Sequence, residues 1–478
     1  MKLTFWGAAG QVTGSMFLLE TDDDYRILVD CGFDMERERS PEDPIDAHPS
    51  RLFPFEASMV NTVILTHAHI DHSGNIPNLI REGFEGQIVC TSPTMTLTEL
   101  LLEDSASIHE RKWKKYRRQK DRQPFSKNGI TLPKEWFVKK HVNWAKEQFF
   151  PIQFNRRFQL AEGVHVTLLP AGHLLGAAHV LLEVVERGEK KTILFSGDLG
   201  RYNYPLLPDP AIPPQVDYLI CESTYGDKQR STVGEPEEVL LDIVKEACVS
   251  KAGKLIIPAF SVGRTQALLF TLNKLYLKKK LPPIKVFSDS PLAHSSTRAY
   301  MKYVNMLNDE AQAFYEEHRV LFDFENLVYV EKLKQSKALA YLNEPCIIIS
   351  SSGMVQGGRI EHHVRANIQN PQSTILMVGY AAEGTLGHEL LSGAKTITAH
   401  KEKEEVEVLA NIESIDVFSG HGDQADLLRF VSHQDPERLK KIFLVHGELQ
   451  SMQTFKQLLH ERRFREVEIP LRGQTFEL

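Results

Sequence analysis

The spacing of hydrophobic positions changes twice along the 478 residues of the chain. Residues 3 to 30 form short alternating apolar runs separated by glycine, a pattern typical of antiparallel strands. From about residue 217, apolar runs alternate with segments of helical periodicity, which predicts a doubly wound parallel sheet. Apolar runs at 415–418 and 442–445 then predict a return to short strands. The pattern favours an α/β protein in which one domain is inserted into another.

The changes in pattern also predict the domain boundaries. We expect a first domain built from residues 1–214 and 399–478, and an inserted domain over residues 215–398. Residues 94–150 have a long charged helical pattern, which we interpret as an insertion on the rim of the first domain. Eight basic and two aromatic residues lie between Arg111 and Arg122. Such a run is more often a solvated helix face, but a local surface that guides nucleic acid is the alternative.

Composition narrows the class of protein. The net charge of −7 means that any nucleic acid must be bound through a local basic surface. The five cysteines are widely spaced without a Cys-x-x-Cys pair, which argues against a disulfide framework and a thiolate metal site and fits a reducing cytoplasm. No apolar stretch approaches the ~18 to 20 residues of a membrane span, and the N-terminus lacks a signal-peptide pattern. We expect a soluble cytoplasmic protein without a membrane partner.

A cluster of potential metal ligands follows the apolar residues 63–65. Residues 67–72 read His-Ala-His-Ile-Asp-His, which places three imidazoles and a carboxylate on the turn that leaves a predicted strand. Imidazole nitrogen and carboxylate oxygen suit Zn²⁺. Two later glycine-flanked loops contain His173 and Asp198. A carboxylate such as Asp198 can bridge two ions held roughly 3.5 to 4 Å apart, so the motifs predict a two-metal centre.

The order of these motifs resembles the metallo-β-lactamase superfamily, and further motifs resemble its β-CASP family of nucleases. Within that family the likeness is to bacterial and archaeal RNA-processing enzymes and to the endonuclease subunit of the eukaryotic pre-mRNA 3′-end processing factor. It implies an αββα sandwich with an inserted doubly wound β-CASP domain, whereas the enlarged segment 94–150 departs from the compact bacterial members. The further motifs are residues 7–15, 222–226, 352–354, 383–388, 420–421 and 445–448.

The resemblance also implies a role for each candidate residue. His388 would protonate the leaving oxygen with Glu222 beside it, since a carboxylate partner raises the pKa of a histidine. A metal-bridged hydroxide would attack phosphorus. A buried structural pair is the alternative for Glu222 and His388. The implied ligands of two zinc ions are His67, His69 and His173 for one, Asp71, His72 and His421 for the other, and Asp198 for both.

Three other polar residues receive separate expectations. By the resemblance, Asp30 would orient a zinc-ligating histidine, as outer carboxylates do in general. His179 has no place in the two-metal scheme and is expected to be a packed, structural histidine. His446 is compatible equally with a phosphate contact and with a structural hydrogen bond.

The leading hypothesis is a zinc-dependent endoribonuclease that hydrolyses RNA phosphodiester bonds in RNA processing or decay, with RNA as its partner. A hydrolase of a small ester is one alternative, and the large insertion at residues 215–398 argues against it. A DNA-directed nuclease is another, against which His421 argues by resemblance. A non-catalytic subunit is the third, although every expected ligand is present. A homodimer is compatible with the sequence.

Overall fold

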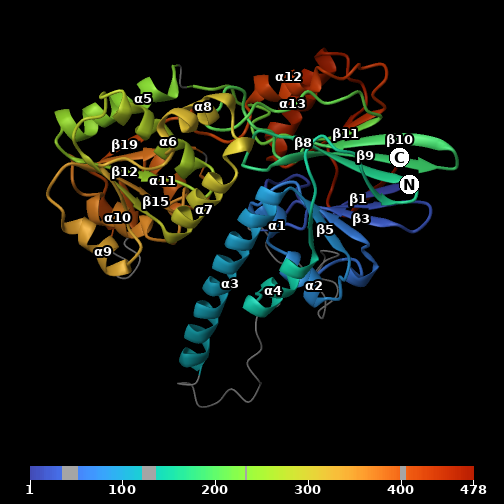
Figure 1. Cartoon of the computed structure of the whole chain (residues 1–478), viewed down its shortest axis with the longest axis horizontal. Coiled ribbons are helices and arrows are strands. Elements are labelled where there is room, and N and C mark those ends of the chain that lie inside the picture. The colour runs from blue at the N-terminus through green and yellow to red at the C-terminus, as the bar shows by residue number, and fades with distance from the viewer. Residues whose placement is uncertain (35–51, 121–135, 232–233, 380, 399–404) are drawn as a thin grey trace. The chain divides into compact units, whose positions relative to one another are not determined.

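The computed structural model describes residues 1–34, 52–120, 136–231, 234–379, 381–398 and 405–478 (Figure 1). Two compact units make up the chain. The first comprises Met1–Tyr202, Asp209–Gln229 and His421–Leu478, and the second comprises Asn203–Pro208 and Arg230–Gly420. The second unit is therefore inserted into the first, as the hydrophobic pattern predicted. The particular boundaries at residues 214 and 398 stay a prediction.

Two seven-stranded sheets form the centre of the first unit (Figure 1). β1, β2 and β3 pair antiparallel, as predicted for residues 3 to 30, and β3 to β6 continue in parallel. The strands of the first sheet, in spatial order, are β22 (Gln474–Glu477), β1 (Lys2–Phe5), β2 (Phe17–Glu20), β3 (Arg26–Val29), β4 (Thr62–Ile64), β5 (Gln87–Cys90) and β6 (Phe149–Pro151). Those of the second are β21 (Val467–Glu468), β20 (Lys441–Val445), β11 (Tyr218–Glu222), β10 (Glu189–Phe195), β9 (Ala178–Glu186), β8 (Val164–Pro170) and β7 (Phe158–Ala161).

A buried apolar core joins the two sheets. It includes Leu3 and Phe5 of β1 together with Val166, Val180 and Phe443 of the second sheet. Each buried apolar side chain favours the folded state by roughly 25 cal/mol per Å² removed from water. A slip of one residue would turn these side chains outward, so the core sets the register of the strands. The polar motifs at the strand ends are thereby held at defined positions.

Helices cover the outer face of each sheet, which gives the four layers seen in Figure 1. α2 and α4 pack on the first sheet through Leu79 and Ala145, and α12 and α13 pack on the second through Phe430 and Phe455. The predicted αββα sandwich is confirmed. The helices of this unit are η1 (Ala57–Met59), α1 (Ile70–Ser73), α2 (Ile76–Arg81), α3 (Ser92–Lys120), α4 (Lys139–Gln148), α12 (Gln424–Val431) and α13 (Leu449–Glu461).

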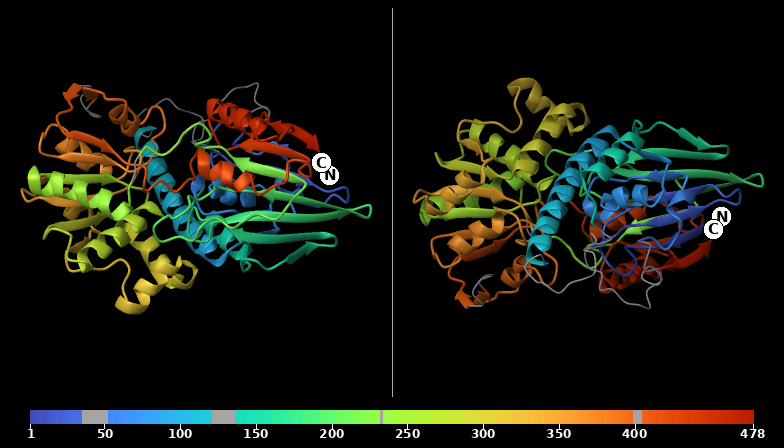
Figure 2. Two further views of the ribbon diagram at one scale, coloured as in Figure 1. Left: turned by 90° about the horizontal axis from the view of Figure 1, so that it is seen from above. Right: turned by 90° about the horizontal axis from the view of Figure 1, so that it is seen from below.

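The two chain ends lie side by side in the first sheet. β1 pairs antiparallel with β22, with Lys2 opposite Glu477, and both views of Figure 2 show the termini together. Among the described residues, no helix combines the length and the apolar character needed to cross a membrane. The longest helix, α3, has 29 residues but carries many charges.

A six-stranded parallel sheet organises the second unit, which confirms the predicted doubly wound arrangement. Its spatial order is β14 (Leu327–Tyr329), β13 (Lys285–Asp289), β15 (Cys346–Ser350), β12 (Lys254–Pro258), β16 (Thr374–Met377) and β19 (Asn411–Ser414). A separate hairpin joins β17 (Thr396–Thr398) to β18 (Glu405–Glu407). The helices are α5 (Pro236–Val244), η2 (Lys245–Ser250), α6 (Arg264–Leu277), α7 (Pro291–Lys302), η3 (Val304–Met306), α8 (Asp309–His318), α9 (Leu333–Ala338), η4 (Leu339–Tyr341), α10 (Ile360–Asn367) and α11 (Leu386–Leu391).

The prediction of a strand at residues 415–418 is wrong. The strand there is β19, at Asn411–Ser414, and it extends the sheet of the second unit by pairing parallel to β16. The apolar residues Ile415, Val417 and Phe418 are buried in the turn that follows it. Burial in a turn and burial in a strand both require apolar side chains, which explains the misplacement.

Burial of His179 makes the stability of the first unit depend on pH. Its ring is fully buried on β9, where Nδ1 donates to the Ser196 carbonyl and the ring packs at a tilt against Phe430, so the expected structural role is confirmed. Burial lowers the pKa of His179 to about 4. An unfolded histidine has a pKa near 6.5, so between these pH values the unfolded state binds the extra proton. The contribution is present above pH 6.5 and is lost as the pH falls toward 4.

We predict that protonation of His179 in the unfolded state reduces the free energy of unfolding by roughly 2 kcal/mol when the pH falls from 7 to 5. All four tryptophans (Trp6, Trp113, Trp136 and Trp144) lie in the first unit, so tryptophan fluorescence during urea denaturation reports on it. With a chelator present at both pH values, the advantage of the wild type over His179→Gln should shrink by about that amount. His433→Gln, at an exposed histidine, is the control. A difference between wild type and His179→Gln that is independent of pH would contradict the prediction.

Candidate metal centre

The His-Ala-His-Ile-Asp-His motif lies where parallel strand β4 ends and α1 begins. The adjacent segment after β3 holds it in place, because the backbone N–H groups of Cys31 and Phe33 donate to the carbonyls of His72 and Ile70. Gly32 lies between them, and a Cβ atom at Gly32 would be 1.7 Å from the Asp71 carbonyl oxygen. Only glycine permits this approach of two backbones, which is how a four-residue helix keeps a defined position.

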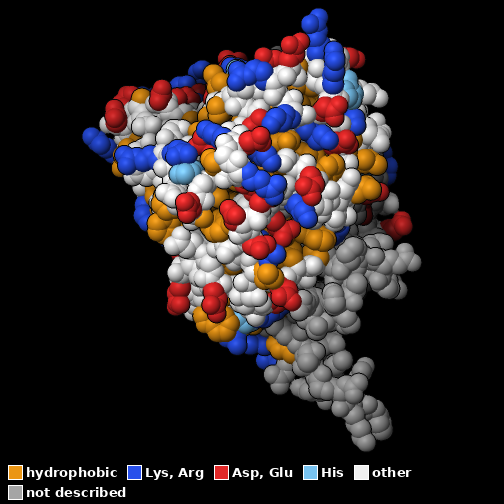
Figure 3. All heavy atoms as spheres, turned by 90° about the vertical axis from the view of Figure 1, so that its right-hand side faces the viewer, with side chains coloured by type: hydrophobic (Ala, Val, Ile, Leu, Met, Phe, Trp, Pro, Cys, Tyr) orange, Lys and Arg blue, Asp and Glu red, His pale blue; other side chains and the backbone are white. Residues whose placement is uncertain are grey.

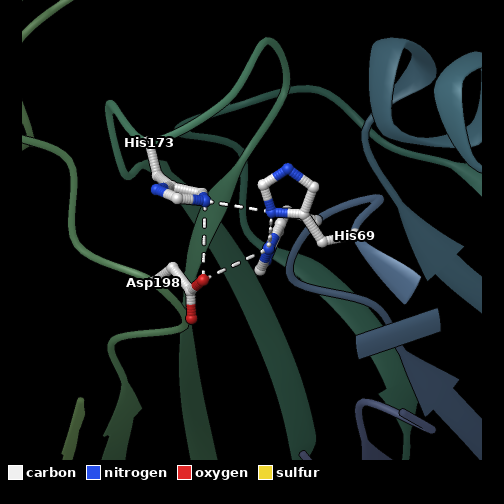
Figure 4. Close-up of side chains that lie close together, drawn as sticks. His69, His173 and Asp198 are labelled. Carbon is white, nitrogen blue, oxygen red and sulfur yellow. Dashed lines mark hydrogen bonds and ion pairs between the residues drawn. The ribbon is translucent and has the colours of Figure 1, made fainter. Parts of the chain in front are cut away.

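One group of donor atoms consists of His67, His69, His173 and Asp198, whose nearest ligand atoms all lie within 4.8 Å of one another (Figure 4). Nδ1 of His69 lies 3.1 Å from Nε2 of His67 and 3.2 Å from Nε2 of His173. Oδ2 of Asp198 lies 3.4 Å from Nε2 of both His67 and His173. Three nitrogens and one oxygen thus face a common point, as a tetrahedral zinc site requires.

A second group consists of Asp71, His72 and His446. Nε2 of His446 lies 3.1 Å from Nε2 of His72 and 3.5 Å from Oδ2 of Asp71. Oδ1 of Asp198 faces this group, at 3.1 Å from His72 Nε2 and 3.5 Å from His446 Nε2. Each oxygen of Asp198 therefore faces a different donor group, the arrangement expected of a bridging carboxylate.

The position of His421 differs from the expectation. Its Nε2 lies 3.8 Å from Oδ2 of Asp198, but Asp71 and His72 are grouped with His446. Its Nδ1 instead donates to Oε1 of Glu222 at 3.2 Å. The contacts thus place His446, and not His421, beside Asp71 and His72. Sequence reasoning left His446 open because two glycine-flanked histidine loops follow two short apolar runs, and only contacts distinguish them.

Glu222 is fully buried at the end of β11, and its described hydrogen-bond partners lie in the first unit. Oε1 accepts the backbone N–H of Leu199 and the Nδ1–H of His421, while Oε2 accepts the N–H of Thr224. His388 lies in α11 of the second unit, where its N–H donates to the Thr385 hydroxyl. A catalytic role for His388 stays a prediction.

Three of the candidate ligands have their Nδ1 atoms occupied by neighbouring oxygens. Nδ1 of His72 lies 2.7 Å from Asp30, Nδ1 of His67 lies 3.1 Å from the Thr66 hydroxyl, and Nδ1 of His446 lies 3.0 Å from the Thr224 hydroxyl. A carboxylate or hydroxyl at Nδ1–H leaves Nε2 with its lone pair, the form in which imidazole binds a metal. Asp30 thus contacts the ring of a candidate ligand, His72, as expected, and its role in orienting a zinc ligand stays a prediction.

The histidines of the first group are held neutral. Burial lowers the pKa of His67 well below its ordinary value and that of His69 to about 4, so both rings are uncharged near pH 7. A metal ligand must have a free nitrogen lone pair, and a neutral imidazole supplies it without releasing a proton.

Opposite charges are concentrated in the second group. Burial raises the pKa of Asp71 and of Asp198, but the neighbouring histidines His72 and His446 outweigh it and lower both. Conversely, burial lowers the pKa of His72 and of His446, but the neighbouring carboxylates raise both pKa values above the ordinary value, and Asp198 has the largest effect among them. The pKa of His446 is raised to about 9. Two buried carboxylates are thus balanced by positive charge at a place where a divalent cation fits equally well.

The three parts of the chain match three family models. Residues 9–242 match the metallo-beta-lactamase superfamily, residues 265–390 match the Beta-Casp domain, and residues 405–470 match the Zn-dependent metallo-hydrolase RNA specificity domain. The matches agree with the αββα sandwich, the inserted parallel sheet and the C-terminal strands that complete the first unit.

Known proteins with similar sequences cover nearly the whole chain. A ribonuclease of Thermus thermophilus is 32% identical over 478 residues, covering 100% of this chain and 98% of the relative. An RNase J-like protein of Methanocaldococcus jannaschii is 30% identical, covering 98% of each. The transcription termination factor FttA of Methanosarcina mazei is 28% identical over 94% of this chain and 67% of the relative. The chain therefore belongs to the β-CASP family of the metallo-β-lactamase superfamily.

Proposed function

We propose that this protein is a zinc-dependent endoribonuclease that hydrolyses RNA phosphodiester bonds in RNA processing or decay. The observation that carries the proposal is the position of Asp198 between two groups of nitrogen and oxygen donors, because a shared carboxylate is typical of a two-metal hydrolytic centre. RNA is proposed as the substrate because the relatives include a ribonuclease and an RNase J-like protein, and because residues 405–470 match an RNA specificity domain.

The two donor groups fit zinc because they combine imidazole nitrogens with carboxylate oxygens. Neither group contains a thiolate, and neither consists of oxygen donors alone. Two Zn²⁺ ions bound here would activate a water molecule near neutral pH and offset negative charge on the phosphoryl oxygens. The ligands we propose are His67, His69 and His173 for one ion, Asp71, His72 and His446 for the other, and Asp198 for both.

We propose His421 as the general acid, in place of His388. Its Nδ1–H donates to buried Glu222, and its Nε2 lies 3.8 Å from Oδ2 of Asp198, at the edge of the donor groups. Glu222 opposes the effect of burial and raises the pKa of His421, so the ring is able to hold a second proton on Nε2. In this proposal the proton on Nε2 passes to the leaving oxygen. Glu222 then serves to orient the ring and to stabilise its charge.

The proposed cellular location rests on the cysteines. All five cysteines are buried free thiols, in keeping with a protein that does not depend on disulfides. We propose the cytoplasm as its location on the cysteine pattern, and a homodimer stays a prediction.

Metal analysis tests the centre. We predict about two zinc ions per chain, loss of zinc and of RNA cleavage in His67→Ala and Asp198→Ala, and no change in the control His433→Ala, whose ring is exposed. Asp198→Ala should affect both ions, because its two oxygens face different groups. Cleavage of internally labelled RNA is measured beside a matched single-stranded DNA and a small ester. Full RNA cleavage by metal-free protein would refute the proposal, and a preference for DNA or ester would establish one of the alternatives.

Three histidine variants separate acid from ligand. His446→Ala should lose one zinc ion, whereas His421→Ala should retain both and slow cleavage by roughly 10² to 10⁴, the usual effect of a general acid. His388→Ala should keep its zinc and cleave at near the wild-type rate. Single-turnover rates and zinc content are measured on the same preparations. Slow cleavage by His388→Ala with normal cleavage by His421→Ala would restore the assignment that the resemblance alone implied.

The hydroxyl of Thr224 gives a finer test of the second ligand group. It accepts from Nδ1–H of His446 and donates to the His446 carbonyl at 3.1 Å. Thr224→Val keeps the size of the side chain and removes both contacts, so we predict a fall in zinc affinity of roughly 10- to 100-fold. Thr224→Ser should retain the affinity. Competition with a zinc-binding dye measures it, and equal affinities for the valine and serine variants would show that the hydroxyl does not orient the ligand.

A further inference from the structure

α3 consists of two halves with different surroundings. In the first half, Leu102 and Ala106 are buried in a cluster with Phe137 and Val142. His109 stacks on Trp136, with ring centroids 5.6 Å apart. The second half, from Arg111 onward, contains seven basic and no acidic residues up to Lys120. The helix therefore passes from a packed, mixed-charge part into a purely basic part.

The described cations of the basic half are exposed. Arg111, Lys112, Lys114, Lys115 and Arg118 are all exposed, and no ion pair involves them among the residues that the structure describes. Burial raises the pKa of Asp104, in the packed half of the helix, and the charge of Arg111 partly offsets that rise. On the face shown in Figure 3, by contrast, basic and acidic side chains are intermingled.

Helical geometry gathers four of these cations on one side. At about 100° per residue, Arg111, Lys114, Lys115 and Arg118 fall within an arc of about 100°, and Trp113 points to the opposite side. Trp113 is half-buried, in agreement with that direction. The side chains of Tyr116, Lys120 and Arg122 lie outside the part of the chain that the structure describes. We name the four exposed cations on this arc the α3 basic face.

The same helix is fixed to the metal centre at two points. The hydroxyls of Thr91 and Thr94 donate to the Gly176 carbonyl, in the loop that carries His173. Ile70, between His69 and Asp71, packs against the cluster of Leu102 and Ala106. With a rise of 1.5 Å per residue, Arg111 and Arg118 lie roughly 8 and 18 Å along the helix beyond Ala106. The α3 basic face is thus held at a set distance from the metal-binding loop.

We propose that the α3 basic face binds the sugar–phosphate backbone of the RNA substrate on one side of the cleaved bond. The choice of RNA rests on the proposed function. A protein of net charge −7 repels a polyanion at long range, so a local cationic surface is needed to hold it. Cations that lie roughly 8 to 18 Å along the helix beyond Ala106 are suited to flanking nucleotides and not to the reacting phosphate. Since Trp113 faces away, contact is to phosphates and independent of base sequence.

The test is the salt dependence of RNA binding. A labelled unstructured RNA is titrated with the protein in a chelator, which prevents cleavage, between 50 and 200 mM salt. Arg111→Gln, Lys115→Gln and Arg118→Gln are combined, because glutamine is a good helix former and the helix should persist. The control combines Lys280→Gln, Lys334→Gln and Lys337→Gln, which removes the same charge from exposed positions of the second unit. Each lost phosphate contact flattens the slope of log K against log salt by about 0.7, so the α3 variant should lose about 2 units and the control none.

Further measurements separate this proposal from the proposed function. Circular dichroism and zinc content establish that the α3 variant is folded. Its hydrolysis of bis(4-nitrophenyl) phosphate, a small phosphodiester, should match the wild type while its KM for RNA rises. If wild-type protein hydrolyses neither this compound nor RNA, the proposed function fails and the binding slopes still decide the role of the helix.

Three outcomes would overturn the proposal. One is an unchanged slope in the α3 variant, and another is an equal loss of slope in the control. The third is retained RNA binding with loss of binding to vesicles of anionic phospholipid, which would assign the basic face to a membrane surface.

Discussion

The candidate centre depends on one buried carboxylate that faces two groups of donors. Oδ2 of Asp198 lies beside His67 and His173, and Oδ1 lies beside His72 and His446. A carboxylate without its partners would be costly to bury, so the site must supply compensating positive charge, from protonated histidines or from metal ions. The same requirement explains why several histidines surround one aspartate in an otherwise apolar interior.

Strand register brings these residues together from distant parts of the chain. β4 leads into the histidine motif, β10 ends just before Asp198, β11 ends at Glu222 and β20 ends just before His446. β10, β11 and β20 are parallel neighbours, so their carboxyl ends meet at one edge of the second sheet. The core between the sheets holds that register, because a slip of one residue would expose its apolar side chains. Catalytic geometry is in this sense a consequence of apolar packing.

The long helix α3 links the metal-binding loop to a basic surface. Its packed half contacts Ile70 inside the histidine motif, and its basic half extends beyond the packing partners described. A helix transmits position over this length because its hydrogen bonds are internal, whereas a loop of equal length would not. The basic run, whose role the sequence left open, is therefore connected through one rigid helix to the residues of the candidate metal centre.

The sequence by itself determined the fold class, the inserted parallel sheet and most of the donor residues, because periodicity and closely spaced motifs are local properties. Only the tertiary structure distinguished the contacts of His421 from those of His446, which both follow apolar runs in glycine-flanked loops. Their contacts differ: His446 meets Asp71 and His72, whereas His421 meets Glu222. Likewise, the strand near this point is set by pairing with β16, which takes residues 411–414 and leaves 415–418 in the turn that follows. Both questions concern contacts between residues up to hundreds of positions apart, and such contacts are set by the packing of whole sheets and not by local preference.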